Sequence, residues 1–157
     1  MAEQSELFGP RQKQSLVIFL FIVAGLVFVG WPSADQGDAN TQINRAFEEM
    51  VAAAEKHELD AFKKHLSDDI KDENDRGKQA MLYMLNTIYK RHPKVYLSII
   101  DVTIYDGTNP NVKEATLELM MGETPVPTDK GSFNVTFRNE SGTWRVWEAK
   151  WNGGYGD

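Results

Sequence analysis

Cysteine is absent from this chain of 157 residues. Disulfide bonds, thiolate metal ligands and thiol nucleophiles are therefore excluded together. Basic residues are also few, since 17 Lys and Arg stand against 23 Asp and Glu, a formal net charge of −6. No basic cluster interrupts this acidic balance, whereas nucleic acid is bound by Lys and Arg placed against phosphates. The sequence therefore predicts no nucleic-acid partner.

Motifs with a chemical signature are missing as well. No serine lies in a G-x-S-x-G context, and the sequence has no glycine-rich phosphate loop and no metalloprotease motif. The acidic run over residues 68–75 lacks the alternating oxygen ligands and central glycine of an EF-hand loop. Asp72 and Asp75 have the residue type of a general base, but their polar neighbours favour solvated carboxylates. The histidines are isolated from other ligands, which favours cap, surface or packing roles: His57, His65 and His92. We therefore predict no catalytic residue, no metal site and no cofactor.

One long hydrophobic run is present, from Leu16 to Trp31, and it carries no charge. At about 1.5 Å per residue, a helix over this run covers about 24 Å of a hydrocarbon core about 30 Å thick, and uncharged neighbours extend the span. Arg11 and Lys13 precede the run, and the next basic residue is Arg45. This charge bias predicts a cytoplasmic N-terminus. The run thus predicts a single-pass helix in the lipid bilayer of the cell membrane.

The alternative interpretation of this run is a cleaved secretory signal. Cleavage needs small residues at the last and third-last positions before the cut. The third-last position is Pro32 for a cut after Ala34 and Phe28 for a cut after Gly30. Retention of the anchor is therefore favoured. The predicted organisation is a cytoplasmic tail over residues 1–15, a transmembrane anchor over 16–33, a linker over 34–40 and a periplasmic domain over 41–157.

Helical periodicity occupies the first half of the predicted domain. From Thr41 to Lys56 apolar residues recur at spacings of three and four, with Asn40 or Thr41 as the N-cap. A short helix is predicted from Glu58 to Leu66, followed by a polar link over residues 67–77. A third helix is predicted from Lys78 to Arg91, and a proline two residues later ends the helical part.

Beyond this proline the period changes from 3.6 to 2. Strands are predicted over residues 95–105, 113–121, 132–138 and 143–151. The segment GETPVPTDKG between the second and third strands contains two prolines, which favours an exposed loop. Three helices followed by four mainly antiparallel strands predict an α+β fold, with the helices packed on one face of a curved sheet.

The closing segment FRNESGTWRVWEAKW combines a strand, a polar turn with glycine, and a second strand that begins and ends with Trp. It resembles the end of the nuclear-transport-factor-2-like superfamily, which includes SnoaL-like proteins and ketosteroid isomerase. The segment HELDAFKKHLSDD is similar to the second helix of that superfamily and the acidic link after it. The resemblance covers about Asn40 to Trp151 and implies a cone of the cystatin-like type, but little about activity. The isomerase branch has a tyrosine towards the end of the first helix, where this chain has His57.

A cone of this kind implies a pocket between the helices and the open end of the sheet. The alternative role for large apolar side chains there is simply to fill the core. The candidate lining residues are Phe47, Met81, Tyr83, Met84, Tyr89, Trp147 and Trp151.

The last strand has Trp144 and Val146 on one face and Trp147, Ala149 and Trp151 on the other. Residues 95–105 also carry apolar side chains at both odd and even positions, so both faces of the sheet are expected to be covered. We expect a homodimer, with Trp144 and Val146 on the association face, or an envelope protein as partner. The predicted function is a membrane-anchored extracytoplasmic binding or assembly module, an accessory subunit of an envelope complex. The alternative is a small-molecule isomerase or dehydratase that uses the pocket in the cone.

Overall fold

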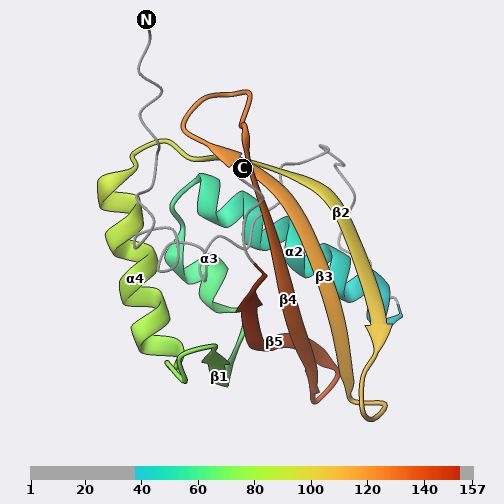
Figure 1. Cartoon of the computed structure of the whole chain (residues 1–157). Coiled ribbons are helices and arrows are strands. Elements are labelled where there is room, and N and C mark those ends of the chain that lie inside the picture. The colour runs from blue at the N-terminus through green and yellow to red at the C-terminus, as the bar shows by residue number, and fades with distance from the viewer. Residues whose placement is uncertain (1–37, 153–157) are drawn as a thin grey trace, which may run out of the picture.

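The computed structural model describes residues 38–152, which form a layer of helices against a curved sheet (Figure 1). The predicted tail and the predicted anchor at Leu16–Trp31 lie outside the described residues. Within residues 38–152, no helix combines the length and the apolar character that crossing a membrane requires. The membrane anchor therefore stays a prediction from the sequence.

Three helices make up the first layer. Helix α2 (Ala39–Glu55) begins earlier than expected, because Asp38 is its N-cap and accepts the backbone N–H of Thr41 at 2.9 Å. Helix α3 (Leu59–Lys63) ends before the predicted boundary at Leu66. Helix α4 (Lys78–Arg91) has the predicted bounds. Helix α2 crosses behind the sheet and α4 flanks its β1 edge (Figure 1).

The second layer is a mixed five-stranded sheet in the order β1-β5-β4-β3-β2. Four strands lie close to their predicted positions and are antiparallel neighbours: β2 (Tyr96–Asp106), β3 (Val112–Gly122), β4 (Asp129–Glu140) and β5 (Thr143–Trp151). The strand that was not predicted is β1 (Leu66–Asp72), which pairs in parallel with β5. The α+β prediction is confirmed, but the count of four strands is wrong, because the link assigned to residues 67–77 contains this edge strand.

A bulge in β5 changes which of its residues face the helices. Val146 pairs with Phe137 and Glu148 pairs with Thr136, so Trp147 has no partner opposite it on β4. The extra residue shifts the alternation of the strand by one position. In a regular strand, two residues an odd number of positions apart lie on opposite faces. Across the bulge at Trp147, such residues share one face.

The prediction that Trp144 and Val146 form an association face is wrong. Trp144 is only 6% exposed, Val146 is fully buried, and both belong to the core between the sheet and the helices. Because of the bulge, Ala149 joins them on this inner face.

A second bulge, in β2, explains why that strand has apolar residues at odd and even positions. The register shifts between Ile99 and Asp101, which leaves Ile100 unpaired and exposed. Ile99 and Val102 are opposite Leu119 and Leu117 of β3, and both pack against the core. The apolar side chains of β2 thus lie mainly on one face, and the expectation of an apolar second face is also wrong.

Candidate functional site

Apolar side chains occupy the interior of the fold, between α2 and the sheet. Phe47 of α2 packs edge-to-face on Phe137 of β4, with ring centroids 5.1 Å apart. The largest fully buried side chains also include Phe62, Phe133 and Met50. Side chains from both layers thus meet where the sequence predicted a ligand pocket.

The residues predicted to line a pocket do not come together as one site. Phe47, Met81 and Tyr89 are buried members of the core, and Met84 and Trp151 are partly buried against it. Tyr83 is 74% exposed on α4, and Trp147 is 37% exposed at the bulge of β5. Helical periodicity located the core face correctly, but Tyr83 and Trp147 point away from it.

Asp72 is buried, contrary to the prediction of a solvated carboxylate. Its side chain accepts the backbone N–H groups of Asn74 at 2.8 Å and Arg76 at 2.9 Å, and the guanidinium of Arg76 at 2.5 Å. These bonds close the turn between β1 and α4, so Asp72 has a structural role. Asp75 is exposed and forms an ion pair with Lys71 at 2.9 Å.

A polar network joins β1 to the β4–β5 hairpin. Ser67 is fully buried and donates its hydroxyl to Glu140 at 2.5 Å, while Arg138 donates to Glu140 at 2.6 Å and to Ser67 at 3.0 Å. Arg138 also reaches Asp69 at 3.1 Å, and its guanidinium lies 5.2 Å from the ring centroid of Trp147. Because its charges are paired with one another, this network anchors the edge strand β1.

His57 and Tyr89 form a stacked pair between the ends of α2 and α4. Their ring centroids are 4.3 Å apart at an interplanar angle of 11°. The Nε2 atom of His57 and the hydroxyl of Tyr89 are buried and have no hydrogen-bond partner among residues 38–152. Burial lowers the pKa of His57 and raises the pKa of Tyr89. His57 also has a positive φ of 58°, an uncommon conformation for a non-glycine residue. A partly buried histidine beside a buried tyrosine is one arrangement that supports acid–base chemistry.

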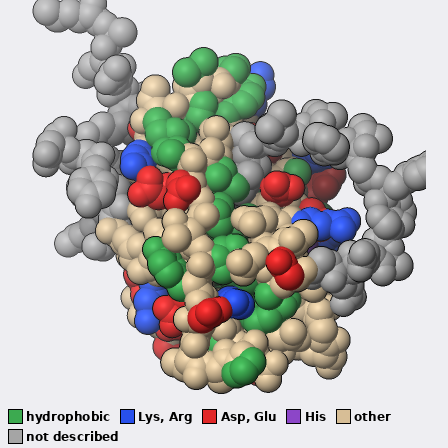
Figure 2. Space-filling model, turned by 90° about the vertical axis from the view of Figure 1, so that its right-hand side faces the viewer, with side chains coloured by type: hydrophobic (Ala, Val, Ile, Leu, Met, Phe, Trp, Pro, Cys, Tyr) green, Lys and Arg blue, Asp and Glu red, His purple; other side chains and the backbone are tan. Residues whose placement is uncertain are grey.

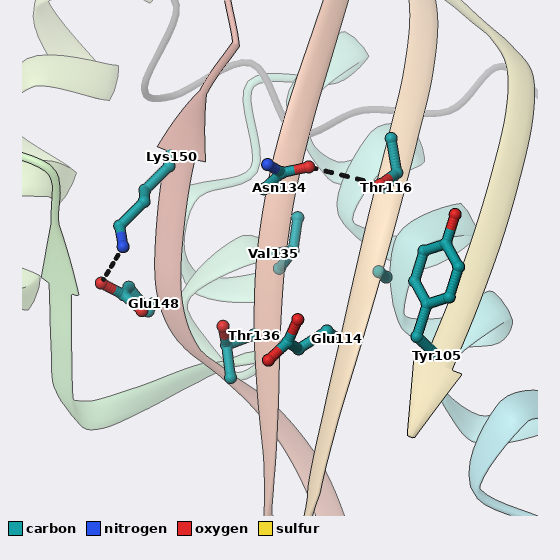
Figure 3. Close-up of a pocket in the computed structure, with 9 residues that line it drawn as sticks. Tyr105, Glu114, Thr116, Asn134, Val135, Thr136, Glu148 and Lys150 are labelled. Carbon is teal, nitrogen blue, oxygen red and sulfur yellow. Dashed lines mark hydrogen bonds and ion pairs between the residues drawn. The ribbon is translucent and has the colours of Figure 1, made fainter. Parts of the chain in front are cut away.

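A hollow of about 350 Å³ lies on the outer face of the sheet, the face turned away from the helices (Figure 3). Strand register places its polar side chains in two neighbouring rows across β2, β3, β4 and β5. Tyr105 forms one wall with half of its surface exposed. Polar side chains around the hollow include Glu114, Thr116, Asn134, Thr136 and Lys150.

The hollow contains both paired and free polar groups. Lys150 forms an ion pair with Glu148 at 2.9 Å, and Thr116 donates to Asn134 at 3.3 Å (Figure 3). Asn134 in turn donates to Asn152 at 2.9 Å. Glu114 makes no hydrogen bond or ion pair with any residue in the described range 38–152. One carboxylate of the hollow is therefore available to a ligand.

Charges are dispersed over the side of the molecule on which β2 lies. Acidic and basic side chains lie near one another among polar and apolar ones, without a field of one sign (Figure 2). Among residues 38–152, no group of three His, Asp or Glu side chains is arranged to hold a metal ion. The described surface therefore offers a mixed polar site.

The residues of the hollow were not identified from the sequence. Glu114, Thr116 and Asn134 lie on different strands and have no motif in common. The only indication in the sequence is the alternation of polar and apolar residues, since Glu114 and Thr116 flank the buried Ala115 on β3. Alternation assigns these residues to the outer face, but the pairing of four strands is needed to bring them together.

Comparisons with known proteins identify the fold. No protein-family model and no curated protein matches this sequence. Among solved structures, a nuclear-transport-factor-2-like protein of unknown function from Pseudomonas putida is 16% identical, with a TM-score of 0.62 over 72% of this chain and 84% of that one. An uncharacterised protein with a cystatin-like fold from Caulobacter vibrioides is 13% identical, with a TM-score of 0.63 over 73% and 89%.

A provisionally assigned scytalone dehydratase from Novosphingobium aromaticivorans is also similar, with 12% identity and a TM-score of 0.61 over 71% of this chain and 81% of that one. At these identities the likeness concerns the fold and not the activity. The described part of the chain, helices against a curved sheet, has the nuclear-transport-factor-2-like, cystatin-like fold that its closing segment resembles.

Proposed function

We propose that this chain is a membrane-anchored binding or assembly module that presents the outer face of its sheet outside the cytoplasm. The observation that carries the proposal is the contrast between the two faces. The inner face is covered by buried apolar side chains such as Phe47 and Phe137, whereas the outer face has a hollow with an unpaired carboxylate, Glu114. Binding sites of modules need exposed polar groups, while buried apolar side chains mainly stabilise the fold.

The placement rests on the uncharged run Leu16–Trp31 and on Arg11 and Lys13 before it. Protease added outside spheroplasts should therefore digest the domain that follows the anchor, while a cytoplasmic marker stays intact. Protection of the domain until the membrane is opened would contradict this orientation. Intact mass then distinguishes an anchored chain from one cleaved before Asp35.

An accessory role in an envelope complex follows from this placement, and site-specific photo-crosslinking tests it. A photoreactive residue at Thr116 or Thr136, both in the hollow, should yield one and the same crosslinked envelope protein. The matched control is Tyr83, an exposed position on α4 in the helical layer. An identical product from Tyr83, or none from either strand position, would argue against binding through the outer face.

Self-association stays part of the proposal, but through different residues from those predicted. Trp144 and Val146 are buried, so the large hydrophobic side chains that the sheet exposes are Ile100, Tyr105 and Trp147. Sedimentation of the full chain in detergent tests the homodimer, with Tyr105→Glu as the disrupting variant. A monomer at all accessible concentrations would leave a different envelope protein as the partner.

A second candidate function is a small-molecule dehydratase or isomerase. The stacked pair of His57 and Tyr89 favours it, because each has a buried polar atom without a hydrogen-bond partner in the described part of the chain. A structural neighbour is also provisionally assigned as a dehydratase of the nuclear-transport-factor-2-like family. If this pair is catalytic, the chain should turn over a panel of β-hydroxy ketones or β,γ-unsaturated ketones, and Tyr89→Phe should abolish turnover. Tyr83→Phe, which alters an exposed tyrosine of the same helix, is the control.

A further inference from the structure

The hollow on the outer sheet face has the donors and acceptors of a site for uncharged, hydroxyl-rich molecules. Asn134 supplies an amide, Thr116 and Thr136 supply hydroxyls, and Lys150 supplies an ammonium group. Hydroxyl groups of a ligand both donate and accept, so they can use all of these groups at once. This reading rests on the proposed binding function and specifies the ligand class of the same face.

The charges of the hollow disfavour an anionic ligand. Lys150 is already paired with Glu148, so its charge is balanced within the hollow. Glu114 is the carboxylate left over, and a carboxylate accepts hydrogen bonds from hydroxyl groups but repels phosphates and other anions. Nucleotides, polyphosphates and acidic peptides are therefore poor occupants.

Tyr105 adds a flat apolar surface beside these polar groups. It is 53% exposed on β2, directly opposite Glu114 on β3. An aromatic ring gains contact area with little loss of side-chain entropy. The ring face suits the C–H groups on one side of a sugar ring, while the hydroxyl groups at the edge of that sugar reach neighbouring polar side chains.

We propose that this hollow binds a sugar unit of an oligosaccharide, with Tyr105 as the stacking platform and Glu114 as the hydrogen-bond acceptor. The hollow lies across β2, β3, β4 and β5, so the remaining units of a longer chain would continue along these strands on either side. An extracytoplasmic domain held at a membrane would meet such glycans in the cell envelope.

Titration calorimetry of the full chain in a zwitterionic detergent without a sugar headgroup tests this proposal. The probes are hexamers of N-acetylglucosamine, glucose in α-1,4 linkage and glucose in β-1,4 linkage. At least one hexamer should bind, and Tyr105→Ala should weaken its binding by about tenfold or more, as expected for truncation of an aromatic anchor. Glu114→Gln, which keeps the shape but removes the charge, should weaken binding to a smaller extent.

Tyr83→Ala is the matched control, because it removes an exposed tyrosine from α4 and should leave binding unchanged. Circular dichroism melting shows that each variant is folded. Absence of binding by all three hexamers, or equal binding by wild type and Tyr105→Ala, overturns the sugar proposal. The crosslinks from Thr116 and Thr136 address the binding module independently, so its failure and the failure of the sugar class are distinguishable.

Discussion

Trp144 and Trp147 are three residues apart on β5, yet their surroundings differ. Trp144 is buried against the helices, whereas Trp147 is at the bulge, stacked beside Arg138 and partly exposed. Trp144→Ala should therefore destabilise the domain by roughly 3 kcal/mol or more, because it leaves a large cavity in the core. Trp147→Ala should lower the free energy of unfolding by much less. Urea unfolding compares the two, and equal losses would mean that the faces of β5 are assigned incorrectly.

Glu140 is a residue whose ionisation is tied to folding. Burial raises its pKa, but hydrogen bonds from Ser67 and Arg138 outweigh this, so the pKa lies below its ordinary value of 4.5. A carboxyl group with a lowered pKa in the fold stabilises the protein above its unfolded pKa. This stabilisation should fade as the pH falls below about 4.5.

Thermal melting of Glu140→Gln between neutral and acidic pH measures this contribution. The gap in melting temperature between wild type and Glu140→Gln should narrow as the pH falls. Glu73→Gln is the control, because Glu73 is exposed and makes no hydrogen bond or ion pair with a residue in the described range 38–152. A gap that stays constant with pH would contradict the assigned direction of the pKa shift.

At the scale of elements, the sequence predicted the segments whose periodicity is regular. Helix α4 has its predicted bounds, because its apolar residues keep the helical spacing up to a proline two residues after its end. Strand β1 was not predicted, because LSDDIKD is mostly charged and only Leu66 and Ile70 supply large apolar side chains to the core. Partners distant in the sequence, such as Glu140 for Ser67, stabilise this strand, and a local pattern does not reveal them.

The two bulges, in β2 and β5, explain why the faces of these strands were predicted incorrectly. An inserted residue reverses the alternation beyond it, so a regular period of two assigns Ala149 and Val102 to the wrong face. The residue types of Ile100 and Trp147 do not indicate a bulge. The apparent apolar second face of the sheet came from this effect.

The turn between β2 and β3 offers a test at the same scale. A Cβ atom added at Gly107 would lie 2.6 Å from the carbonyl oxygen of Val112, which is backbone and cannot move away freely. Gly107→Ala should therefore cost about 2 kcal/mol. Gly77→Ala is the control, since its Cβ would meet nothing nearer than 3.9 Å, and it should cost less than about 1 kcal/mol. Equal losses in urea unfolding would contradict the close approach at this turn.

At the scale of the whole molecule, the candidate site depends on the pairing of distant strands. Tyr105, Glu114, Asn134 and Lys150 come from four different strands and meet only through the register of the sheet. The sequence correctly predicted the helix layer and the fold, but it placed the pocket in the cone. That space is lined by the core side chains that hold the two layers together. Residues that pack well in a core and residues that line an apolar pocket have the same periodicity.

We propose that this module binds through the outer face of its sheet and not through the interior of the cone. Nuclear magnetic resonance of the isotope-labelled full chain, with a library of small polar fragments, tests this most directly. Fragments that bind should shift the amide signals of Glu114, Thr116, Asn134 and Thr136. Shifts confined to interior residues such as Met81 and Leu85, or to His57 and Tyr89, would contradict it and favour an enzyme with its site in the cone.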